Sequence, residues 1–141
     1  MAPQMLHKTE IKVRGYHLDL YGHVNNARYL EFLEEARWGL LETTSDIGWF
    51  MQQQLALVVT RIDIRYKRPA TMGDVLVIET QLDRIEEKAA VVAQRIVRAD
   101  NGKLVAEADV TFAVVHPDTI GALTIDGELA QRLGALRGAQ A

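Results

Sequence analysis

The chain has 141 residues, of which 48% are hydrophobic and 25% are charged. This length corresponds to one folded domain, and these fractions are typical of a globular protein rather than a disordered one. The formal net charge of -3 argues against a general nucleic-acid binder, and the lack of cysteine excludes disulfides, thiolate zinc sites and cysteine nucleophiles. No stretch approaches the roughly 18 consecutive apolar residues of a membrane span, and residues 1–10 lack the apolar centre of a signal peptide. We therefore expect a cytoplasmic protein with no membrane insertion.

A short strand and a polar loop are the first predicted elements. Ile11 and Val13 alternate with charged residues, which is typical of a strand that begins near Lys8. Residues 15–25 are rich in Gly, His, Asp and Asn, which favour turns and hydrogen bonds from side chain to backbone. This pattern predicts a loop between the strand and the next element.

A long helix is predicted over about residues 26–44. Asn25 and Asn26 are good residues for capping its start. Apolar residues then recur with a helical period on one side: Tyr29, Leu33, Ala36 and Leu40. Charged residues occupy the other side: Glu31, Glu34, Glu35 and Arg37. Residues 43–48 end this helix, and residues 49–54 are compatible with a short helical turn.

Four strands are predicted after the helix, because the apolar period changes to two residues from Leu55 onward. The first of them ends at Pro69, which cannot donate to a strand ladder, and the others cover residues 75–82, 89–98 and 104–115. Asn-Gly at 101–102 predicts a tight hairpin between the last two. One face of the last strand is apolar: Ala106, Ala108, Val110, Phe112 and Val114. Residues 118–141 are weakly periodic, with a short helix near 128–136.

The predicted element order is one strand, one long helix and four strands in antiparallel succession. A helix beside an antiparallel sheet belongs to the α+β class. One helix cannot cover both faces of a five-stranded sheet, so we expect self-association through a symmetric interface. No repeat or linker divides the chain, which predicts a single domain over 1–141, with a core of about 8–116 and a tail of about 117–141.

The densest polar cluster covers residues 16–26, between the first strand and the long helix. Asp19 and His23 could present a carboxylate and an imidazole to one pocket, where a carboxylate can act as nucleophile or general base. Gly22 allows backbone conformations that a Cβ forbids. The helix that follows Asn25 directs free N–H groups and a positive dipole end toward the loop. A carboxylate beside an oxyanion site suits the hydrolysis of an activated carbonyl such as a thioester.

Simpler structural roles stay open for the same residues. Asp19 could form an Asx-turn, and His23 could be a core histidine bonded to a backbone carbonyl. Asn25 and Asn26 could act only as helix caps. His17 and His23 have no further ligand at zinc spacing, so the sequence predicts no metal site and no cofactor.

Three segments of the chain resemble a known family. Residues 19–30 read DLYGHVNNARYL, which resembles the signature of hotdog-fold thioesterases of the 4-hydroxybenzoyl-CoA thioesterase type. Residues 34–37, EEAR, and residues 62–74, IDIRYKRPATMGD, are similar to the following helix segment and the second-strand region of that family. The resemblance implies a hotdog fold, in which a five-stranded antiparallel sheet wraps a long central helix. It also implies that two protomers form one continuous sheet with active sites at their interface.

The resemblance assigns roles to individual residues. Asp19 would attack the thioester carbonyl or activate water, the backbone N–H of Asn26 would polarise that carbonyl, and His23 would position substrate or water. Further substrate contacts are expected from Tyr21, Gly22, Asn25, Tyr29, Arg65 and Lys67, with Arg84 and Lys88 as other candidates for CoA phosphates. The basic run at 65–68 could equally be a solvated surface.

The expected activity is the hydrolysis of acyl-CoA thioesters to free acid and CoA, in a homodimer whose pairing into tetramers is left open. A non-catalytic module that binds acyl thioesters is one alternative, and an acyl-ACP thioesterase, suggested by the similarity of HVNN at 23–26 to plant enzymes, is another. A hotdog dehydratase or hydratase is disfavoured, because the downstream His of its hydration motif is not found. No nucleic-acid partner is expected.

Overall fold

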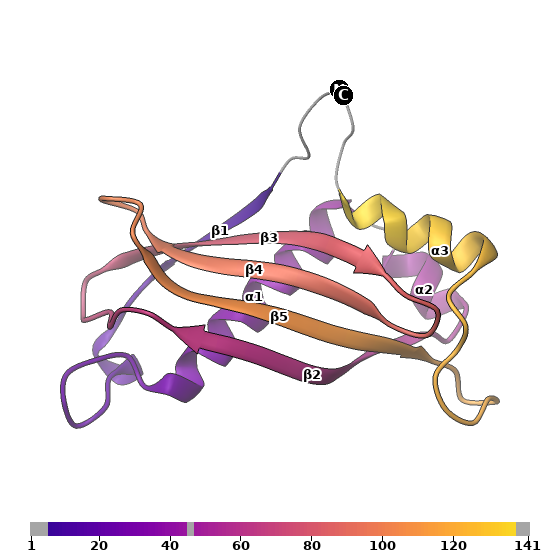
Figure 1. The fold of residues 1–141 in the computed structure, drawn as a ribbon, viewed down its shortest axis with the longest axis horizontal. Helices are drawn as coiled ribbons and strands as arrows, with labels where there is room; N and C mark the ends of the chain where they lie inside the picture. Colours follow the sequence, from indigo (N-terminus) through magenta and orange to yellow (C-terminus); the bar gives the residue numbers. More distant parts are fainter. Residues whose placement is uncertain (1–5, 45–46, 138–141) are drawn as a thin grey trace.

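Five antiparallel strands form one sheet, and α1 (Asn26–Thr44) lies across one face of it (Figure 1). The computed structural model describes residues 6–44 and 47–137. Its strands are β1 (His7–Lys12), β2 (Ala56–Tyr66), β3 (Val75–Ile85), β4 (Ala90–Arg98) and β5 (Leu104–Val115). Its other helices are the 3₁₀ turns η1 (Gly15–His17) and η2 (Ala135–Arg137), and the α-helices α2 (Ile47–Gln52) and α3 (Gly127–Gly134). The α+β class, the helix at 26–44 and the last strand at 104–115 are confirmed.

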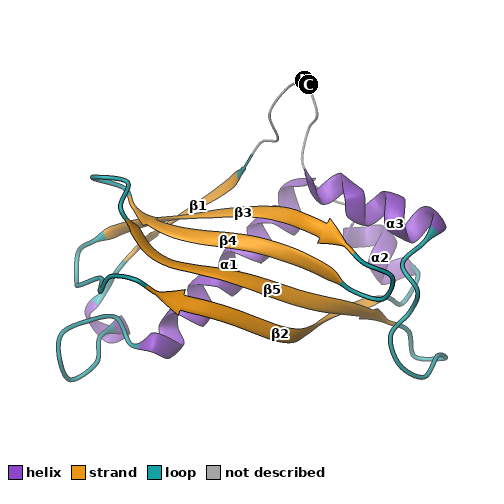
Figure 2. Cartoon of the chain, viewed as in Figure 1, coloured by secondary structure: helices purple, strands orange, loops and turns teal. Residues whose placement is uncertain are grey.

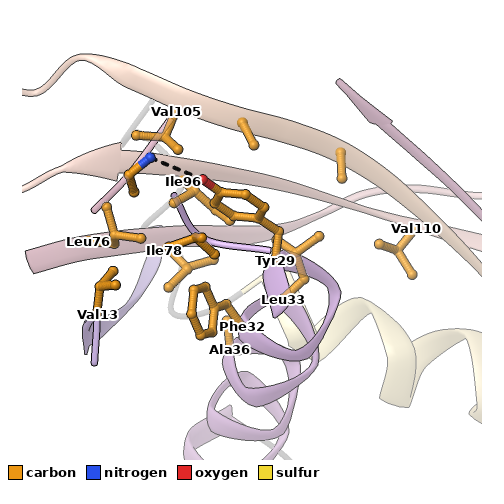
Figure 3. Packing of buried hydrophobic residues seen from close by; sticks show 14 residues of the cluster. Val13, Tyr29, Phe32, Leu33, Ala36, Leu76, Ile78, Ile96, Val105 and Val110 are labelled. Carbon is orange, nitrogen blue, oxygen red and sulfur yellow. Dashed lines mark hydrogen bonds between the residues drawn. The ribbon is translucent and has the colours of Figure 1, made fainter. Parts of the chain in front are cut away.

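The start of α1 is fixed by Asn25, as expected for a capping residue. Its side-chain Oδ1 accepts the backbone N–H of Ala27 at 2.9 Å, and its carbonyl accepts that of Arg28 at 2.8 Å. The apolar side of the helix then packs against the sheet, as Figure 3 shows for Tyr29, Phe32 and Leu33. Each of these side chains is at most 4% exposed, so burial of this side holds α1 in place.

The strand order is β1-β3-β4-β5-β2, which differs from the succession predicted from the sequence. β2 pairs with β5 and not with β3, its successor in the chain. Residues 67–74 make the connection, passing the start of α1, where the N–H of Val24 donates to the carbonyl of Ala70 at 2.8 Å. This crossover leaves β2 at one edge of the sheet and β1 at the other.

A polar network ties α1 to the middle of the sheet, in a region that the sequence presents as apolar. Gln94 of β4 is 1% exposed. Its Nε2 donates to the backbone carbonyl of Leu33 at 3.0 Å and to Oγ1 of Thr80 at 3.1 Å. Its Oε1 accepts Nη1 of Arg37 at 3.1 Å. Arg37, expected on the solvated side of the helix, is therefore half-buried against the sheet.

The segment after β5 contributes to the core. α3 and η2 lie at the end of the sheet that also holds α2 (Figure 2). They bury Leu129, Leu133 and Leu136 in a second apolar cluster with Leu40 and Phe50. The short helix expected near 128–136 is confirmed. Within the described ranges, no helix combines the length and apolar character needed to cross a membrane.

Candidate active site

The polar loop before α1 folds back on itself as a tight hairpin. Leu18 and Val24 form an isolated antiparallel bridge, and the N–H of Asp19 donates to the carbonyl of His23 at 2.8 Å. The N–H of Asn25 donates to the carbonyl of His17 at 2.9 Å. These bonds bring Asp19, His23 and the start of α1 together, as the sequence predicted.

Asp19 forms the Asx-turn that the sequence left open. Its Oδ1 accepts the backbone N–H of Tyr21 at 2.8 Å and that of His23 at 3.2 Å. Gly22 at the tip has φ 78°, a left-handed conformation that favours glycine. In the described part of the chain no group donates to Oδ2 of Asp19, and the residue is exposed. One carboxylate oxygen thus holds the turn while the other is available to a ligand.

The first turn of α1 supplies a free donor beside this loop. Asn25 satisfies the N–H groups of Ala27 and Arg28, whereas the N–H of Asn26 has no acceptor among the residues described. Such a donor at a helix N-terminus, with the positive end of the helix dipole behind it, stabilises negative charge. The loop therefore combines a carboxylate with an oxyanion-binding group.

The start of α1 is held in place by several contacts that the sequence did not predict. Tyr66, at the end of β2, donates its hydroxyl to the carbonyl of Asn26 at 3.1 Å, and its ring lies 5.5 Å from that of Tyr29. Nη2 of Arg28 donates to the carbonyl of Tyr16 at 3.2 Å. His23 also forms an isolated bridge with Thr71. In the sequence, Tyr66 was marked by its place in the apolar alternation of the strand and in the family-like segment 62–74, neither of which indicated a contact with the helix start.

The remaining predicted contact residues are spread over different surroundings. Tyr29 is buried, and its hydroxyl accepts the N–H of Ala70 at 3.2 Å (Figure 3). Burial raises the pKa of Tyr29, while the hydrogen bond with the backbone of Ala70 acts in the opposite direction. Tyr21 is exposed beside Asp19. Arg65 lies in a shallow polar depression on the sheet face opposite α1. Lys67 is also exposed and directly follows Tyr66, so of these two basic residues only Lys67 adjoins a residue that contacts the helix start.

His17, rather than His23, is the buried histidine of the loop. His23 is exposed, whereas His17 is 8% exposed with its ring 4.9 Å from that of Phe32. Nδ1 of His17 accepts the N–H of Arg14 at 2.9 Å. No group of three or more potential metal ligands occurs among the described side chains. His17 therefore anchors the loop to α1.

The surroundings of His17 predict a pH-dependent stability. Burial, followed by the charge of Arg28, lowers the pKa of His17 from its ordinary value of 6.5. The unfolded chain then binds a proton more readily than the folded one, so the free energy of unfolding decreases as the pH falls through about 6.5. Urea titrations at about pH 7.5 and 5.5 should show a larger loss in the wild type than in His17→Asn. An equal loss in both proteins would assign the pH dependence to other groups.

A largely apolar groove lies at the other end of α1. It has a volume of about 440 Å³ and runs between the second half of α1, α2 and the first half of β2. Its walls include Leu41, Phe50, Leu57 and Phe112, with Trp38 and Met51 half or more exposed. A groove of this size and character is typical of a site for a small apolar ligand.

Comparison with known proteins gives consistent matches along the chain. Residues 13–133 match the family model described as the thioesterase-like superfamily. The chain is 48% identical over 126 residues to the long-chain acyl-CoA thioesterase FadM of Escherichia coli (strain K12), covering 89% of this chain and 96% of that one. It is 34% identical over 108 residues to the acyl-CoA thioester hydrolase YbgC of Escherichia coli O6:H1, covering 74% and 80%.

Solved structures agree with these matches. The crystal structure of YbaW, a probable thioesterase from Escherichia coli, has a TM-score of 0.89 at 45% identity and covers 94% of this chain and 99% of that one. The 12:0-ACP thioesterase from Umbellularia californica has a TM-score of 0.84 at 14% identity, covering 93% of this chain and 50% of that one. The second similarity shows the fold alone.

Proposed function

Because this chain belongs to the thioesterase-like superfamily and has its hotdog fold, we propose that it hydrolyses acyl-CoA thioesters to free acid and CoA. The thioesterase activity expected from the sequence agrees with the names of both relatives, at 48% and 34% identity. The family match does not single out the 4-hydroxybenzoyl-CoA type. The observation that carries the proposal is the carboxylate of Asp19, held by its Oδ1 in the loop that leads into α1, whose first N–H, that of Asn26, has no acceptor among the residues described.

The proposed reaction uses both groups of that loop. The carboxylate of Asp19 either attacks the thioester carbonyl or removes a proton from an attacking water. The N–H of Asn26 donates to the carbonyl oxygen as negative charge develops on it. The carbon–sulfur bond then breaks, and the CoA thiolate takes one proton of the water that is consumed. In the general-base route that water adds to the carbonyl directly, and in the nucleophilic route it hydrolyses the anhydride formed between the acyl group and Asp19. His23, with Tyr21, Gly22 and Asn25, would position substrate around this centre, and Arg65 and Lys67 are proposed for the CoA phosphates.

A thiol-release assay over acyl-CoA substrates of increasing length tests this activity. The protein has no cysteine, so any thiol detected comes from released CoA. We expect kcat/KM to increase with the length of the acyl chain until the groove is filled, because each buried methylene contributes about 0.8 kcal/mol to substrate binding. Binding of acyl-CoA without thiol release would instead support a non-catalytic module. Faster turnover of acyl-ACP than of acyl-CoA would identify the carrier protein as the substrate carrier.

Tyr66 should contribute to turnover by fixing the helix start. Tyr66→Phe removes the 3.1 Å hydrogen bond to Asn26 and keeps the ring beside Tyr29. A neutral hydrogen bond of this kind contributes about 0.5–1.5 kcal/mol, so we expect kcat to fall up to about tenfold. Steady-state kinetics should show KM within about twofold of the wild type. A rise in KM with unchanged kcat would mean that Tyr66 contacts substrate instead.

A homodimer joined through β2 would complete the site. β1 is a short edge of six residues with a charge at every second position, whereas β2 has eleven residues, and its first five, residues 56–60, carry no charge and expose Val58 and Val59 by 43% and 41%. A long edge strand with an exposed apolar half is a template for pairing with another chain. Two copies pairing antiparallel at β2 would extend the sheet across both protomers.

Such pairing would also join the two ends of α1 into one site. Within one chain, Asn26 and the nearest groove residue, Glu34, are eight residues apart, about 12 Å along the helix. In an antiparallel pair, the Tyr66 end of β2 lies opposite the partner copy's Ala56 end, which lines the groove. We propose that Asp19 of one copy cleaves an acyl chain held in the groove of the other.

Mixed dimers test this arrangement. Asp19→Asn lacks the carboxylate, and Ala56→Trp fills the groove from an exposed position on its wall. Neither homodimer should hydrolyse dodecanoyl-CoA, but the purified heterodimer should recover about half of the wild-type turnover, because one of its two sites is intact. Absence of recovery would place carboxylate and groove in the same chain. Light scattering measures the oligomeric state and separates dimers from tetramers.

A further inference from the structure

Arg37 is, with Glu34, one of two charged side chains among the described residues that line the apolar groove. Its Nη1 donates to Oε1 of Gln94 at 3.1 Å. The guanidinium carries five N–H donors and stays protonated at neutral pH. Over residues 6–44 and 47–137, no other acceptor and no carboxylate within ion-pair distance is found for it. Most of its donors are therefore available to a ligand.

The position of Arg37 is fixed by Gln94, which is itself held by two further hydrogen bonds. Gln94 is held by the backbone of Leu33 on one side and by Thr80 on the other. Arg37 is half-buried, and this burial lowers its pKa, with only the charge of Glu34 acting in the opposite direction. A partly desolvated cation is costly unless it is paired. An anion from a ligand would remove this cost.

The rest of the groove is suited to a hydrocarbon chain. Apart from Arg37, the charged residue in its walls is Glu34, which is exposed and accepts no hydrogen bond from Arg37. The other walls are mainly aliphatic and aromatic, including Leu41, Phe50 and Leu57. An apolar channel with one fixed cation complements an amphiphile that has a single anionic head and a long apolar tail.

We propose that the groove binds a free long-chain fatty acid, with its carboxylate on Arg37 and its chain along the apolar walls. A fatty acid is chosen over other anionic amphiphiles on the basis of the proposed function, because it is the product of that reaction. Fatty acid retained in the groove would then compete with new substrate for the same site.

Calorimetry on the Asp19→Asn protein tests the proposal without turnover. Dodecanoate and 1-dodecanol have the same chain length and differ in the head group, so their Kd values isolate the carboxylate. A charge-assisted hydrogen bond predicts that dodecanoate binds roughly 10- to 100-fold more tightly than the alcohol. Equal binding of both compounds would overturn the assignment to Arg37, and binding of neither would overturn the groove as the site.

Two variants supply matched controls. Arg37→Met should bring the two Kd values within about threefold of each other. Glu34→Gln, one helical turn away, should lower the Kd for dodecanoate and leave the Kd for dodecanol unchanged. An unchanged preference for dodecanoate in Arg37→Met would contradict the proposal. If Arg37→Met does not fold, the acid–alcohol comparison on Asp19→Asn still decides it. Thiol release by the wild type is a separate measurement, so failure of fatty-acid binding is distinguishable from failure of the proposed hydrolysis.

Discussion

Replacing Asp19 with asparagine is expected to lower kcat for acyl-CoA hydrolysis roughly 100- to 10,000-fold, the usual contribution of a general base. Asparagine keeps an oxygen that can accept the backbone N–H groups of Tyr21 and His23, which Oδ1 of Asp19 holds at 2.8 and 3.2 Å. The variant removes the negative charge and the nucleophilic oxygen. The turn and the start of α1 should therefore remain in place while the chemistry stops.

The controls for this prediction separate chemistry from folding. Asp118→Asn changes an exposed carboxylate on the loop after β5, away from the helix start, the groove and β2, and should leave turnover within about twofold of the wild type. The free energy of unfolding of Asp19→Asn should lie within about 0.5 kcal/mol of the wild type in urea titrations. Turnover by Asp19→Asn at the wild-type rate would remove Asp19 from the mechanism and leave the Asx-turn as its only role.

Replacing Leu33 with alanine is expected to lower the free energy of unfolding by about 2.7–5 kcal/mol, because a fully buried leucine leaves a cavity when it is truncated. Leu33 is 0% exposed and packs with Phe32 and Ala36 against the sheet (Figure 3). Its backbone carbonyl, which accepts Nε2 of Gln94, is unaffected by the change. The lost stability is therefore that of side-chain packing.

Ile120→Ala is the matched control for this core substitution. Ile120 is 102% exposed on the loop before α3, so its truncation should change the free energy of unfolding by less than about 0.5 kcal/mol. Urea titrations of both variants give the comparison. A loss below about 1 kcal/mol for Leu33→Ala would mean that the surrounding residues collapse into the space.

The histidines show how far local sequence reasoning reaches at this site. The sequence placed His17, His23 and Asp19 in one polar loop before a helix, and the structure confirms that placement. It gave no reason to bury one histidine and expose the other. His17 is buried because Phe32, one turn and a half into α1, closes over it at 4.9 Å. That contact exists only after the loop has folded onto the helix.

The groove depends even more on tertiary structure. Its walls come from α1, α2, β2, β4, β5 and the η2 turn, which are distant in the sequence. Gln94 lies in a strand otherwise rich in valine and isoleucine, and its partner Arg37 follows the charged pattern of a solvated helix face. Neither residue differs locally from a surface residue, so their pairing was not predictable.

The sequence by itself determined the type, the order and the approximate bounds of the long helix and the five strands. It missed the 3₁₀ turn η1, which lies in the predicted loop, and it ended β3 at residue 82 although the strand continues to Ile85. The cap at Asn25, the helical spacing from Tyr29 to Leu40 and the two-residue alternation of β5 act over a few residues, so they are legible without a fold. Only the tertiary structure decided that β5 separates β2 from β4, which leaves β2 as a free edge. Alternation specifies that a strand has one apolar face but not which strand pairs with it. That choice is made by the burial of all inward faces against α1 at once, a property of the whole chain.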